Sequence, residues 1–252
     1  MSGADIPLPG WPAHRPPPRI AAVMQPYFLP YPGYFALMKH VDVFILDDLA
    51  QYTPKRWMNR NRLRTPDGGW QYFTLPVAHA PARTPICQIQ IAPENWKCRL
   101  FGRLTAYACA PNYAVVCCLL KDFVQSDIAL LNVLNEHALR MIADYLNIDT
   151  PIYLLSRLNL PGYCPPYPKG ENALAVCRAL GTVEEYCNPP GGSAFYPRQP
   201  YREAGIRLRF LEWQLPQAPP GGWQPMLSVL DGMMWLPPGQ LAQSLQNFRL
   251  FE

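Results

Sequence analysis

Two short apolar runs, separated by a proline-rich loop and a helix, constrain the fold of this chain more than any other feature. The first run spans Ile20 to Met24 and the second spans Val43 to Leu46. Runs that are apolar throughout are typical of strands covered on both faces. Between them, QPYFLPYPGYF at 25–35 predicts a rigid loop, and Gly33 to His40 predicts a short helix. This order is a βαβ unit, which predicts two parallel strands.

The rest of the chain continues the alternation of strands and helices. Further strands are predicted at Trp70–Val77, Ile86–Ile91, Ile152–Leu155, Glu184–Cys187 and Ile206–Leu211. Helices are predicted at Asn95–Cys109, Ser126–Leu146, Glu171–Leu180, Pro225–Trp235 and Gly239–Asn247. We therefore expect an α/β fold, with a Rossmann-like parallel sheet flanked by helices and a helical carboxyl-terminal portion.

The first 18 residues, MSGADIPLPGWPAHRPPP, have a composition unlike the rest. They are polar and rich in proline, which predicts a disordered leader over 1–18. The remaining length fits one domain over 19–252. The leader has no apolar core of a secretory signal, and no run is long enough to span a bilayer. We expect a cytoplasmic protein without a membrane partner.

The charge balance and the cysteines narrow the function classes. The net charge of +4, with 16% charged residues, permits an anionic substrate such as a nucleotide or sugar phosphate. No long Lys/Arg run supports non-specific nucleic-acid binding. The eight cysteines show no paired zinc spacing, so we predict no metal site and reduced, mostly buried thiols.

Polar groups follow each of the first two predicted strands. The loop after the first strand holds Gln25, Tyr27 and Tyr34, and ligands of open α/β sheets bind at such strand ends. A helix amino terminus there could bind an anion, with Gly33 admitting it to the backbone. A proline-rich structural turn is the equal alternative. Asp47 and Asp48 follow the second strand and could bind a metal, act as an acid/base pair or orient an amine. Spacing alone favours an exposed strand end with a surface ion pair.

A basic stretch rich in amides and aromatics, Gln51 to Arg64, comes next. Arginine binds phosphate or carboxylate in a forked geometry, and asparagine adds directional amide bonds. A solvated basic face is the alternative, although such a face needs no tryptophan. The predicted site residues of this stretch are Gln51, Tyr52, Asn59, Arg60, Asn61 and Arg62.

A third group of candidates lies late in the chain. Lys169 precedes a predicted helix, and Asn188 and Gly192 belong to the turn NPPGG. These residues could close a ligand cleft from its other side, or form simple turns. Histidines are few; His79 follows a predicted strand and is a weak candidate. Walker and dinucleotide-binding motifs are not found in the sequence.

Taken in order, these stretches resemble the WbqC-like family. The resemblance rests on MQPYFLPYPGYF (24–35), DVFILDDLAQY (42–52), WMNRNRLRTPDGG (57–69), FTLPV (73–77), KGENALAVCRALG (169–181), NPPGG (188–192), EAGIRLRFLEW (203–213) and LSVLD (227–231). It covers nearly the whole chain after Arg19. Members are encoded among polysaccharide and O-antigen functions, and some are suggested to transfer glycine onto an amino sugar.

The resemblance implies an amide-forming acyl or aminoacyl (glycyl-type) transferase acting on a small amine or amino sugar. Asp47, Asp48, Arg60 and Tyr34 are the predicted catalytic residues, with Asp48 as a general base. The donor could be a thioester, an adenylate or an aminoacyl-tRNA.

Two other functions stay open. The first elements are also similar to the start of HIGH-type nucleotidyltransferases and pantothenate-synthetase-like ligases, with Gly33-Tyr34 in the Gly-His place. An ATP-dependent ligase is therefore an alternative, with ATP as its cofactor. A non-catalytic binding protein of a biosynthetic assembly is the other, although a scaffold needs no convergent charges of both signs.

Overall fold

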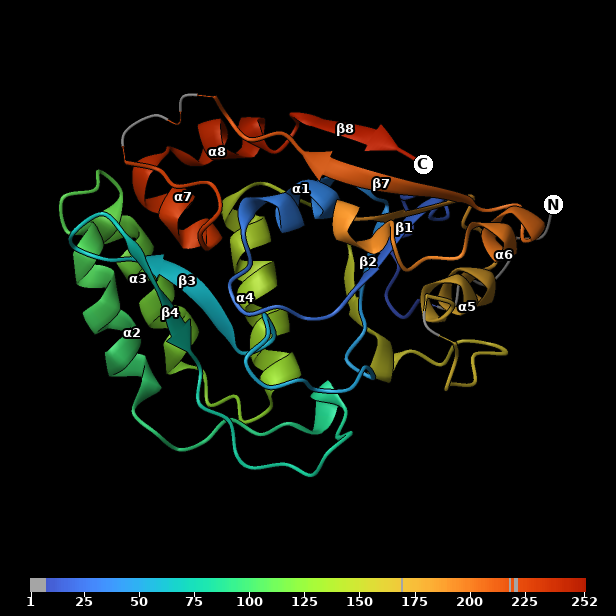
Figure 1. The fold of residues 1–252 in the computed structure, drawn as a ribbon, viewed down its shortest axis with the longest axis horizontal. Helices are drawn as coiled ribbons and strands as arrows, with labels where there is room; N and C mark the ends of the chain where they lie inside the picture. The colour runs from blue at the N-terminus through green and yellow to red at the C-terminus, as the bar shows by residue number, and fades with distance from the viewer. Residues whose placement is uncertain (1–7, 169, 218, 220–221) are drawn as a thin grey trace.

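The computed structural model describes residues 8–168, 170–217, 219 and 222–252 (Figure 1). The described helices and strands are β1 (Ile20–Met24), α1 (Pro32–His40), β2 (Val43–Leu46), β3 (Arg60–Arg64), β4 (Trp70–Thr74), η1 (Ile86–Gln88), α2 (Trp96–Leu104), η2 (Thr105–Tyr107), α3 (Tyr113–Gln125), α4 (Leu131–Tyr145), β5 (Ile152–Leu154), η3 (Leu155–Arg157), α5 (Asn172–Leu180), β6 (Glu185–Asn188), η4 (Pro190–Gly192), α6 (Arg198–Glu203), β7 (Arg207–Trp213), α7 (Val229–Trp235), α8 (Pro238–Ser244) and β8 (Phe248–Phe251).

A six-stranded sheet in the order β5-β2-β1-β6-β7-β8 forms the centre of the molecule. The pairs β1–β2, β2–β5, β1–β6 and β6–β7 are parallel, and β8 joins β7 antiparallel. The predicted Rossmann-like sheet, with β1 and β2 as parallel neighbours, is therefore confirmed. The helical carboxyl-terminal portion is also present as α7 and α8, although the edge strand β8 was not predicted.

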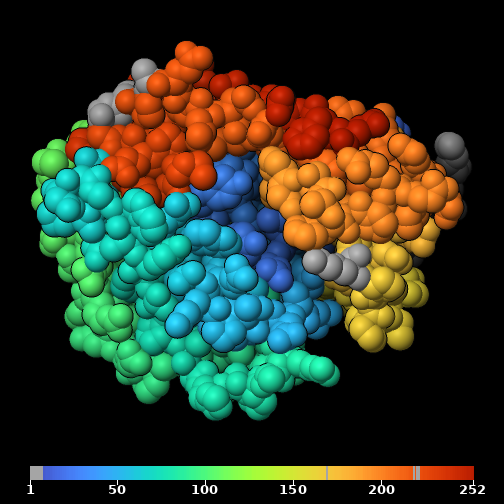
Figure 2. All heavy atoms as spheres, in the orientation of Figure 1, coloured from blue at the N-terminus to red at the C-terminus, as the bar shows by residue number. Residues whose placement is uncertain are grey.

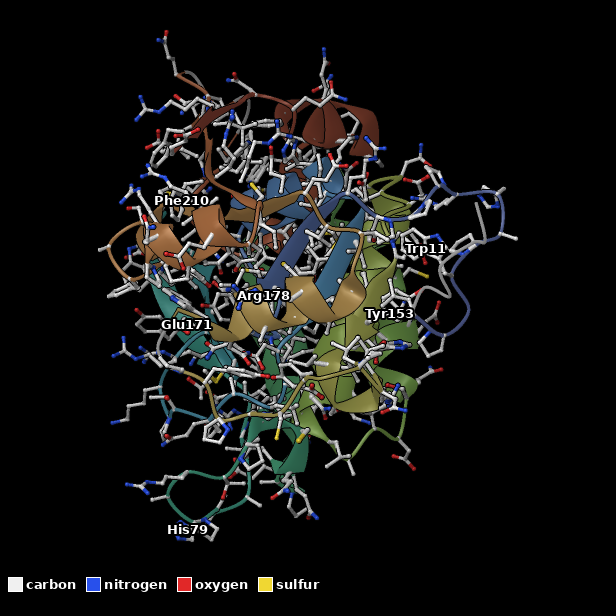
Figure 3. The ribbon with its side chains drawn as sticks, turned by 90° about the vertical axis from the view of Figure 1, so that its right-hand side faces the viewer. Trp11, His79, Tyr153, Glu171, Arg178 and Phe210 are labelled. Carbon is white, nitrogen blue, oxygen red and sulfur yellow. The ribbon has the colours of Figure 1, made fainter. Side chains whose placement is uncertain are left out.

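Helices cover both faces of the sheet, which explains the continuous apolar runs. Ala22 and Phe44 pack in a core with α1 and α4, while Val23 and Ile45 pack in a second core with α5. Successive residues of a strand point to opposite faces, so a strand between two layers needs apolar residues at every position. Figure 3 shows α5, which carries Arg178, lying across one of these faces.

Part of the expected leader lies against this second core. Leu8 is buried in it, Trp11 packs on it, and Arg15 forms an ion pair with Asp149. The side view places Trp11 on the same side of the molecule as Tyr153 (Figure 3). Residues 1–7 lie outside the described residues, and the leader over 1–18 stays a prediction. That 19–252 is a single domain stays a prediction.

The predicted long helix over Ser126–Leu146 is wrong in its first turn. Helix α4 begins at Leu131, and an unpredicted helix, α3, ends at Gln125. The Ser126 hydroxyl donates to the Phe123 carbonyl at the end of α3 and so closes that helix instead of opening the next. The segment between the helices is extended: Ile91 N donates to Ala129 O.

The predicted strand Ile86–Ile91 is also wrong. Its first residues form the 3-10 turn η1, and it makes only isolated bridges thereafter. Ile86 and Ile89 are both buried, so its apolar residues recur at a spacing of three and not at every second position. Conversely, Arg60–Arg64 is a strand, β3, that pairs antiparallel with β4. In this strand the buried residues Asn61 and Leu63 alternate with partly exposed arginines. The arginines make the whole stretch look polar in the sequence, so the strand was not predicted.

Candidate functional site

A cleft of about 650 Å³ opens where β1, β2 and β6 end. The space-filling view shows this hollow near the centre of one face, between the loops that follow β1 and β2 and the segment after β6 (Figure 2). Its lining residues are Val23, Met24, Gln25, Tyr27, Tyr31, Tyr34, Asp47, Trp57, Gly170, Asn188, Pro189, Pro190, Gly191, Gly192, Phe195 and Tyr196.

The topology explains why a cleft forms here. From β1 the chain proceeds to β2 and β5 on one side, then crosses to β6 and β7 on the other. The loops leaving β1 and β6 therefore diverge, and a crevice remains outside the carboxyl ends of these strands. Ligands of open α/β sheets bind at this reversal of strand order.

Asp47 is the only acidic side chain among the residues that line this cleft. Its Oδ1 accepts from Ala50 N at 3.1 Å, and its Oδ2 accepts from Asn172 Nδ2 at 2.9 Å. Burial raises the pKa of Asp47 to about 6, against those two hydrogen bonds and with a smaller contribution from Asp48. A carboxyl group of this pKa, open to a cleft, can accept a proton near neutral pH.

Asn172 is a site residue that the sequence analysis missed. The Tyr163 hydroxyl donates to Asn172 Oδ1 at 2.7 Å, which orients the amide so that its Nδ2 donates to Asp47. Burial, and next Asp47, raise the pKa of Tyr163 to about 12, so the phenol remains a donor. The signal was the stretch Lys169-Gly170-Glu171-Asn172, where α5 begins.

Tyr27, Tyr31, Tyr34 and Tyr196 line other parts of the cleft, and the fully buried Tyr186 packs against Tyr196 without lining it. The hydroxyls of Tyr186 and Tyr196 lie 2.9 Å apart, and Asn188 Nδ2 donates to them at 2.6 and 3.2 Å respectively. Tyr27 and Tyr34, which also line the cleft, pack with ring centroids 5.5 Å apart. Burial raises the pKa of Tyr196, so its hydroxyl is neutral. Such walls offer apolar ring faces and a few fixed hydroxyls to a small ligand.

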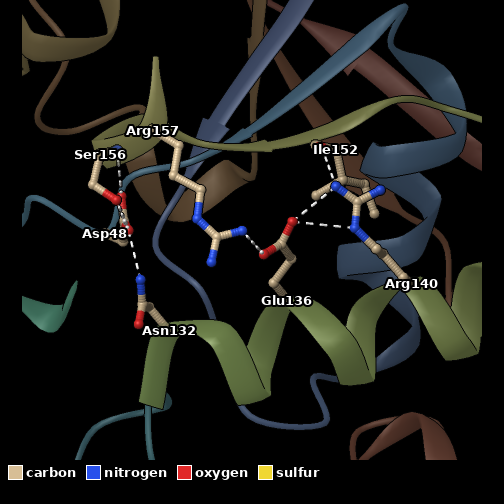
Figure 4. Close-up of polar contacts among 7 residues, drawn as sticks. All are labelled: Asp48, Asn132, Glu136, Arg140, Ile152, Ser156 and Arg157. Atoms are coloured by element: carbon tan, nitrogen blue, oxygen red, sulfur yellow. Dashed lines mark hydrogen bonds and ion pairs between the residues drawn. The ribbon is translucent and has the colours of Figure 1, made fainter. Parts of the chain in front are cut away.

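Asp48 does not share the cleft with Asp47. Its side chain is fully buried, and Ser156 N and Oγ donate to it at 2.8 and 2.6 Å. Asn132 Nδ2 donates to Oδ2 at 2.8 Å, which ties the end of β2 to α4 (Figure 4). The acid/base pair and the base role of Asp48 are therefore not supported, because its oxygens are occupied by protein donors away from the cleft.

The start of α1 is closed to ligands. Tyr34 is buried beneath the cleft, and its hydroxyl donates to Gln25 O at 2.9 Å. A Cβ at Gly33 would lie 2.3 Å from the Tyr31 ring, so this glycine admits Tyr31 and not an anion. Gln25 and Tyr27 do line the cleft as predicted.

The basic stretch divides into structural residues and an outer surface. Asn59 Nδ2 donates to Leu75 O, and Asn61 Nδ2 donates to Phe28 O and Leu29 O, so both amides brace loops. Gln51, Tyr52 and Arg60 do not line the cleft. Arg62 lines an adjoining hollow of about 180 Å³ that shares Tyr27, Tyr31 and Trp57 with it.

The late candidates fall partly on the cleft. Asn188 and Gly192 line it, and Lys169 lies outside the described residues. A Cβ at Gly192 would lie 2.4 Å from Asn188 Oδ1 and 3.0 Å from the Tyr196 ring, so a glycine is required beside these two residues. His79 is exposed at the far edge of the molecule (Figure 3).

The burial of the cysteines differs from the prediction. Cys177 and Cys187 are buried, but Cys98, Cys109, Cys118 and Cys164 are exposed, so the prediction of mostly buried thiols is wrong. Within the described residues, no cluster of three His, Cys, Asp or Glu side chains could hold a metal ion. None of the described helices is both long enough and apolar enough to cross a bilayer.

Comparison with known proteins identifies the family of this chain. A model of the WbqC-like protein family matches residues 25–243, from the end of β1 into α8. The uncharacterized protein Rv1507c of Mycobacterium tuberculosis is 29% identical over 224 residues, which cover 83% of this chain and 90% of that protein. No solved structure matches the chain. Because the family match covers most of its length, this chain belongs to the WbqC-like protein family.

Proposed function

We propose that this protein is an amide-forming enzyme that transfers an acyl or aminoacyl group, such as glycyl, to a small amine or amino sugar, with Asp47 as its general base. The observation that supports this most is one half-buried carboxyl group with a pKa of about 6, in a cleft at the reversal of strand order. Perturbed carboxyl groups in clefts are characteristic of catalytic acids and bases.

The reaction needs one proton acceptor near the attacking nitrogen. The amine attacks the carbonyl carbon of the donor, forming the C–N bond as the bond to the leaving group breaks. The proton lost by nitrogen passes to Asp47 and from there to the leaving group. Asn172 donates to one Asp47 oxygen, and Ala50 N donates to the other, so the carboxylate is held in place, and none of the ion pairs among the described residues involves it.

The walls suit a small polar acceptor. Tyr27 and Tyr196 present ring surfaces on which the apolar face of a sugar can pack. The cleft residue Tyr196 supplies a hydroxyl whose position is fixed by hydrogen bonds with Asn188 and the buried Tyr186. The polysaccharide context implied by the family agrees with such an acceptor, and the donor stays open among a thioester, an adenylate and an aminoacyl-tRNA.

The test is product formation by the purified protein. Amino sugars and simple amines are incubated with glycine and ATP, with glycyl thioesters, or with glycyl-tRNA, and new amides are sought by mass spectrometry. We expect product with one donor class, and about 10²- to 10⁴-fold less product from Asp47→Asn. AMP or ADP release coupled to product would identify the ATP-dependent ligase instead.

A matched control is Asp231→Asn. Burial also raises the pKa of Asp231 to about 6, but this carboxylate lies away from the cleft and accepts from Gln224 N. Its loss should leave the transfer rate within about threefold, whereas a base acts with a 10²-fold or larger effect. Equal activity of Asp47→Asn and the wild type, or saturable binding without turnover for every donor, would refute the proposal and favour a binding protein.

A further inference from the structure

The outer face of the β3–β4 hairpin carries a lattice of arginines and aromatic rings that the amide-forming chemistry does not use. In β3, Arg60 and Arg62 alternate with the buried Asn61 and Leu63. Opposite them, the outward residues of β4 include Tyr72, which pairs directly with Arg62. The hairpin therefore has one core face and one outer face made of cations and rings, which we call the arginine–aromatic face: Trp57, Arg60, Arg62, Trp70 and Tyr72.

The guanidinium groups and rings of this face are preorganised. Arg62 Cζ lies 5.4 Å from the Trp57 ring centre and 5.2 Å from that of Trp70. Arg60 Cζ lies 4.1 Å from the centre of the Tyr72 ring, and the Trp70 and Tyr72 rings meet edge to face at 5.3 Å. Cation–π contacts hold the arginines flat against rings while leaving their N–H groups available to an anion.

Among the described residues, no acidic side chain pairs with the charges of this face. None of the ion pairs or hydrogen bonds among the described residues involves the guanidinium of Arg60 or Arg62, and the Nε of each is buried without a partner. The segment from Leu49 to Pro66 contains five cations and no acidic residue. Nevertheless, Trp70 and Tyr72 remain 48% and 42% exposed. A face that only stabilised the hairpin would not combine exposed rings with uncompensated charge.

The face continues into the cleft. Arg62, Trp57 and Met226 line the hollow of about 180 Å³ beside it, and Trp57, Tyr27 and Tyr31 line both spaces. A ligand with a planar ring on the aromatics and an anionic centre at the arginines can therefore extend its other end toward Asp47. Figure 2 shows the hairpin forming one side of the hollow.

We propose that the arginine–aromatic face binds the nucleoside diphosphate part of one of the two reactants. The base stacks on exposed aromatic rings, and the phosphates accept hydrogen bonds from Arg60 and Arg62. This inference names a substrate class for the proposed transfer and rests on that function. The same chemistry is offered by a nucleoside diphosphate sugar as acceptor, by coenzyme A as the carrier of a thioester donor and by ATP, and the experiment separates these sources.

The test is equilibrium binding to the full-length protein, by calorimetry and by quenching of tryptophan fluorescence. The probes are UDP, UMP, uridine, UDP-N-acetylglucosamine, coenzyme A and ATP. We expect the diphosphates to bind at least tenfold more tightly than uridine, with an affinity that falls as salt rises. Arg62→Gln should weaken binding about tenfold or more, and Trp70→Ala several-fold. The probe that binds most tightly identifies the source.

Controls separate this inference from a general charge effect and from the proposed function. Arg103→Gln removes an exposed positive charge on α2 and should leave the dissociation constant within twofold. Asp47→Asn should bind the probes normally while losing transfer, so each proposal can fail alone. Binding by no diphosphate at low salt, unchanged binding by the double variant Arg60→Gln/Arg62→Gln, or arginine-dependent binding of a CCA-ended RNA in place of the diphosphates would overturn the inference. Because the salt dependence is measured on the wild type, the inference is tested even if a variant fails to fold.

Discussion

The cleft around Asp47 and the polar cluster around Asp48 differ sharply, although their carboxylates are neighbours in the chain. In the cleft, Asp47 accepts from Ala50 N and Asn172 Nδ2 and has an open side. In the cluster between α4 and η3, shown in Figure 4, Asp48 accepts three hydrogen bonds and no solvent reaches it. The same residue type is therefore open to a cleft in one place and enclosed by protein donors in the other.

The comparison shows how two adjacent aspartates at the end of one strand reach different surroundings. Successive residues leaving β2 point to opposite sides, as residues of a strand do. Asp47 turns toward α5, where Asn172 meets it, and Asp48 turns toward α4, where Asn132 meets it. Completing the hydrogen bonds of a buried carboxylate stabilises a fold, whereas burial at the cleft raises the pKa of Asp47 and hence its basicity.

The largest expected effect is on stability, at Asp48. Asp48→Asn should lower the free energy of unfolding by roughly 2–4 kcal/mol, because donors of Ser156 and Asn132 lose a buried anionic acceptor. Urea denaturation measures this loss. Asp149→Asn removes an exposed carboxylate paired with Arg15, and should cost less than about 1 kcal/mol. If Asp47→Asn destabilised the protein as much as Asp48→Asn, the contrast between the two regions would be lost.

The next effect is on activity, at Gly192. A Cβ there would displace Asn188 or Tyr196, so Gly192→Ala should reduce transfer about tenfold, equivalent to about 1.4 kcal/mol. Steady-state rates, with thermal unfolding in parallel, check this. Gly102→Ala, where a new Cβ meets nothing within 4 Å, should leave activity unaltered. An active Gly192→Ala enzyme would show that the tyrosine wall is not needed.

The pH dependence comes third and concerns Asp47 directly. Its folded pKa is raised from 3.8 to about 6, so the proton is bound more tightly in the folded state. Its contribution to stability is therefore greatest at low pH and falls as pH rises from about 4 to about 6. Activity has the opposite trend, since the base must be deprotonated: the rate should rise with pH around a midpoint of about 6.

The variant Asn172→Leu tests whether Asp47 is the group that sets the midpoint of the pH–rate profile. It removes the side-chain donor that lowers the pKa of Asp47, so the midpoint of the rate profile should move upward. A pH–rate profile of the variant measures the shift, and Asn95→Leu, which changes the cap of α2, provides a control without a shift. An unmoved midpoint would mean that another group titrates in the rate.

The smallest effect on stability is expected for the exposed ion pair between Arg157 and Glu136, beside the Asp48 cluster. Arg157 lies 3.4 Å from Glu136, and its side chain is 61% exposed. Arg157→Gln should therefore change the free energy of unfolding by less than about 1 kcal/mol, as exposed ion pairs do. A loss as large as that of Asp48→Asn would show that the whole cluster acts as one cooperative network.

Local patterns alone determined much of this protein. The apolar runs of β1 and β2, and the helix between them, were sufficient to predict a parallel sheet, because buried strands and βαβ units restrict connectivity strongly. The ends of these strands were also sufficient to place Gln25, Tyr27 and Asp47 in one cleft, since crevices form at strand ends in this fold class. The order of the matching stretches along the chain was enough to predict membership of the WbqC-like family, which the family model confirms.

Only the tertiary structure decided which polar residues act together. Asp47 and Asp48 look equivalent in the sequence, and their difference arises from Asn172 and Asn132, which lie far along the chain. The arginines of β3 look like a charged loop, and pairing with β4 turns them into an ordered face beside rings. Burial and partner geometry depend on contacts between distant segments, and a local pattern does not contain them.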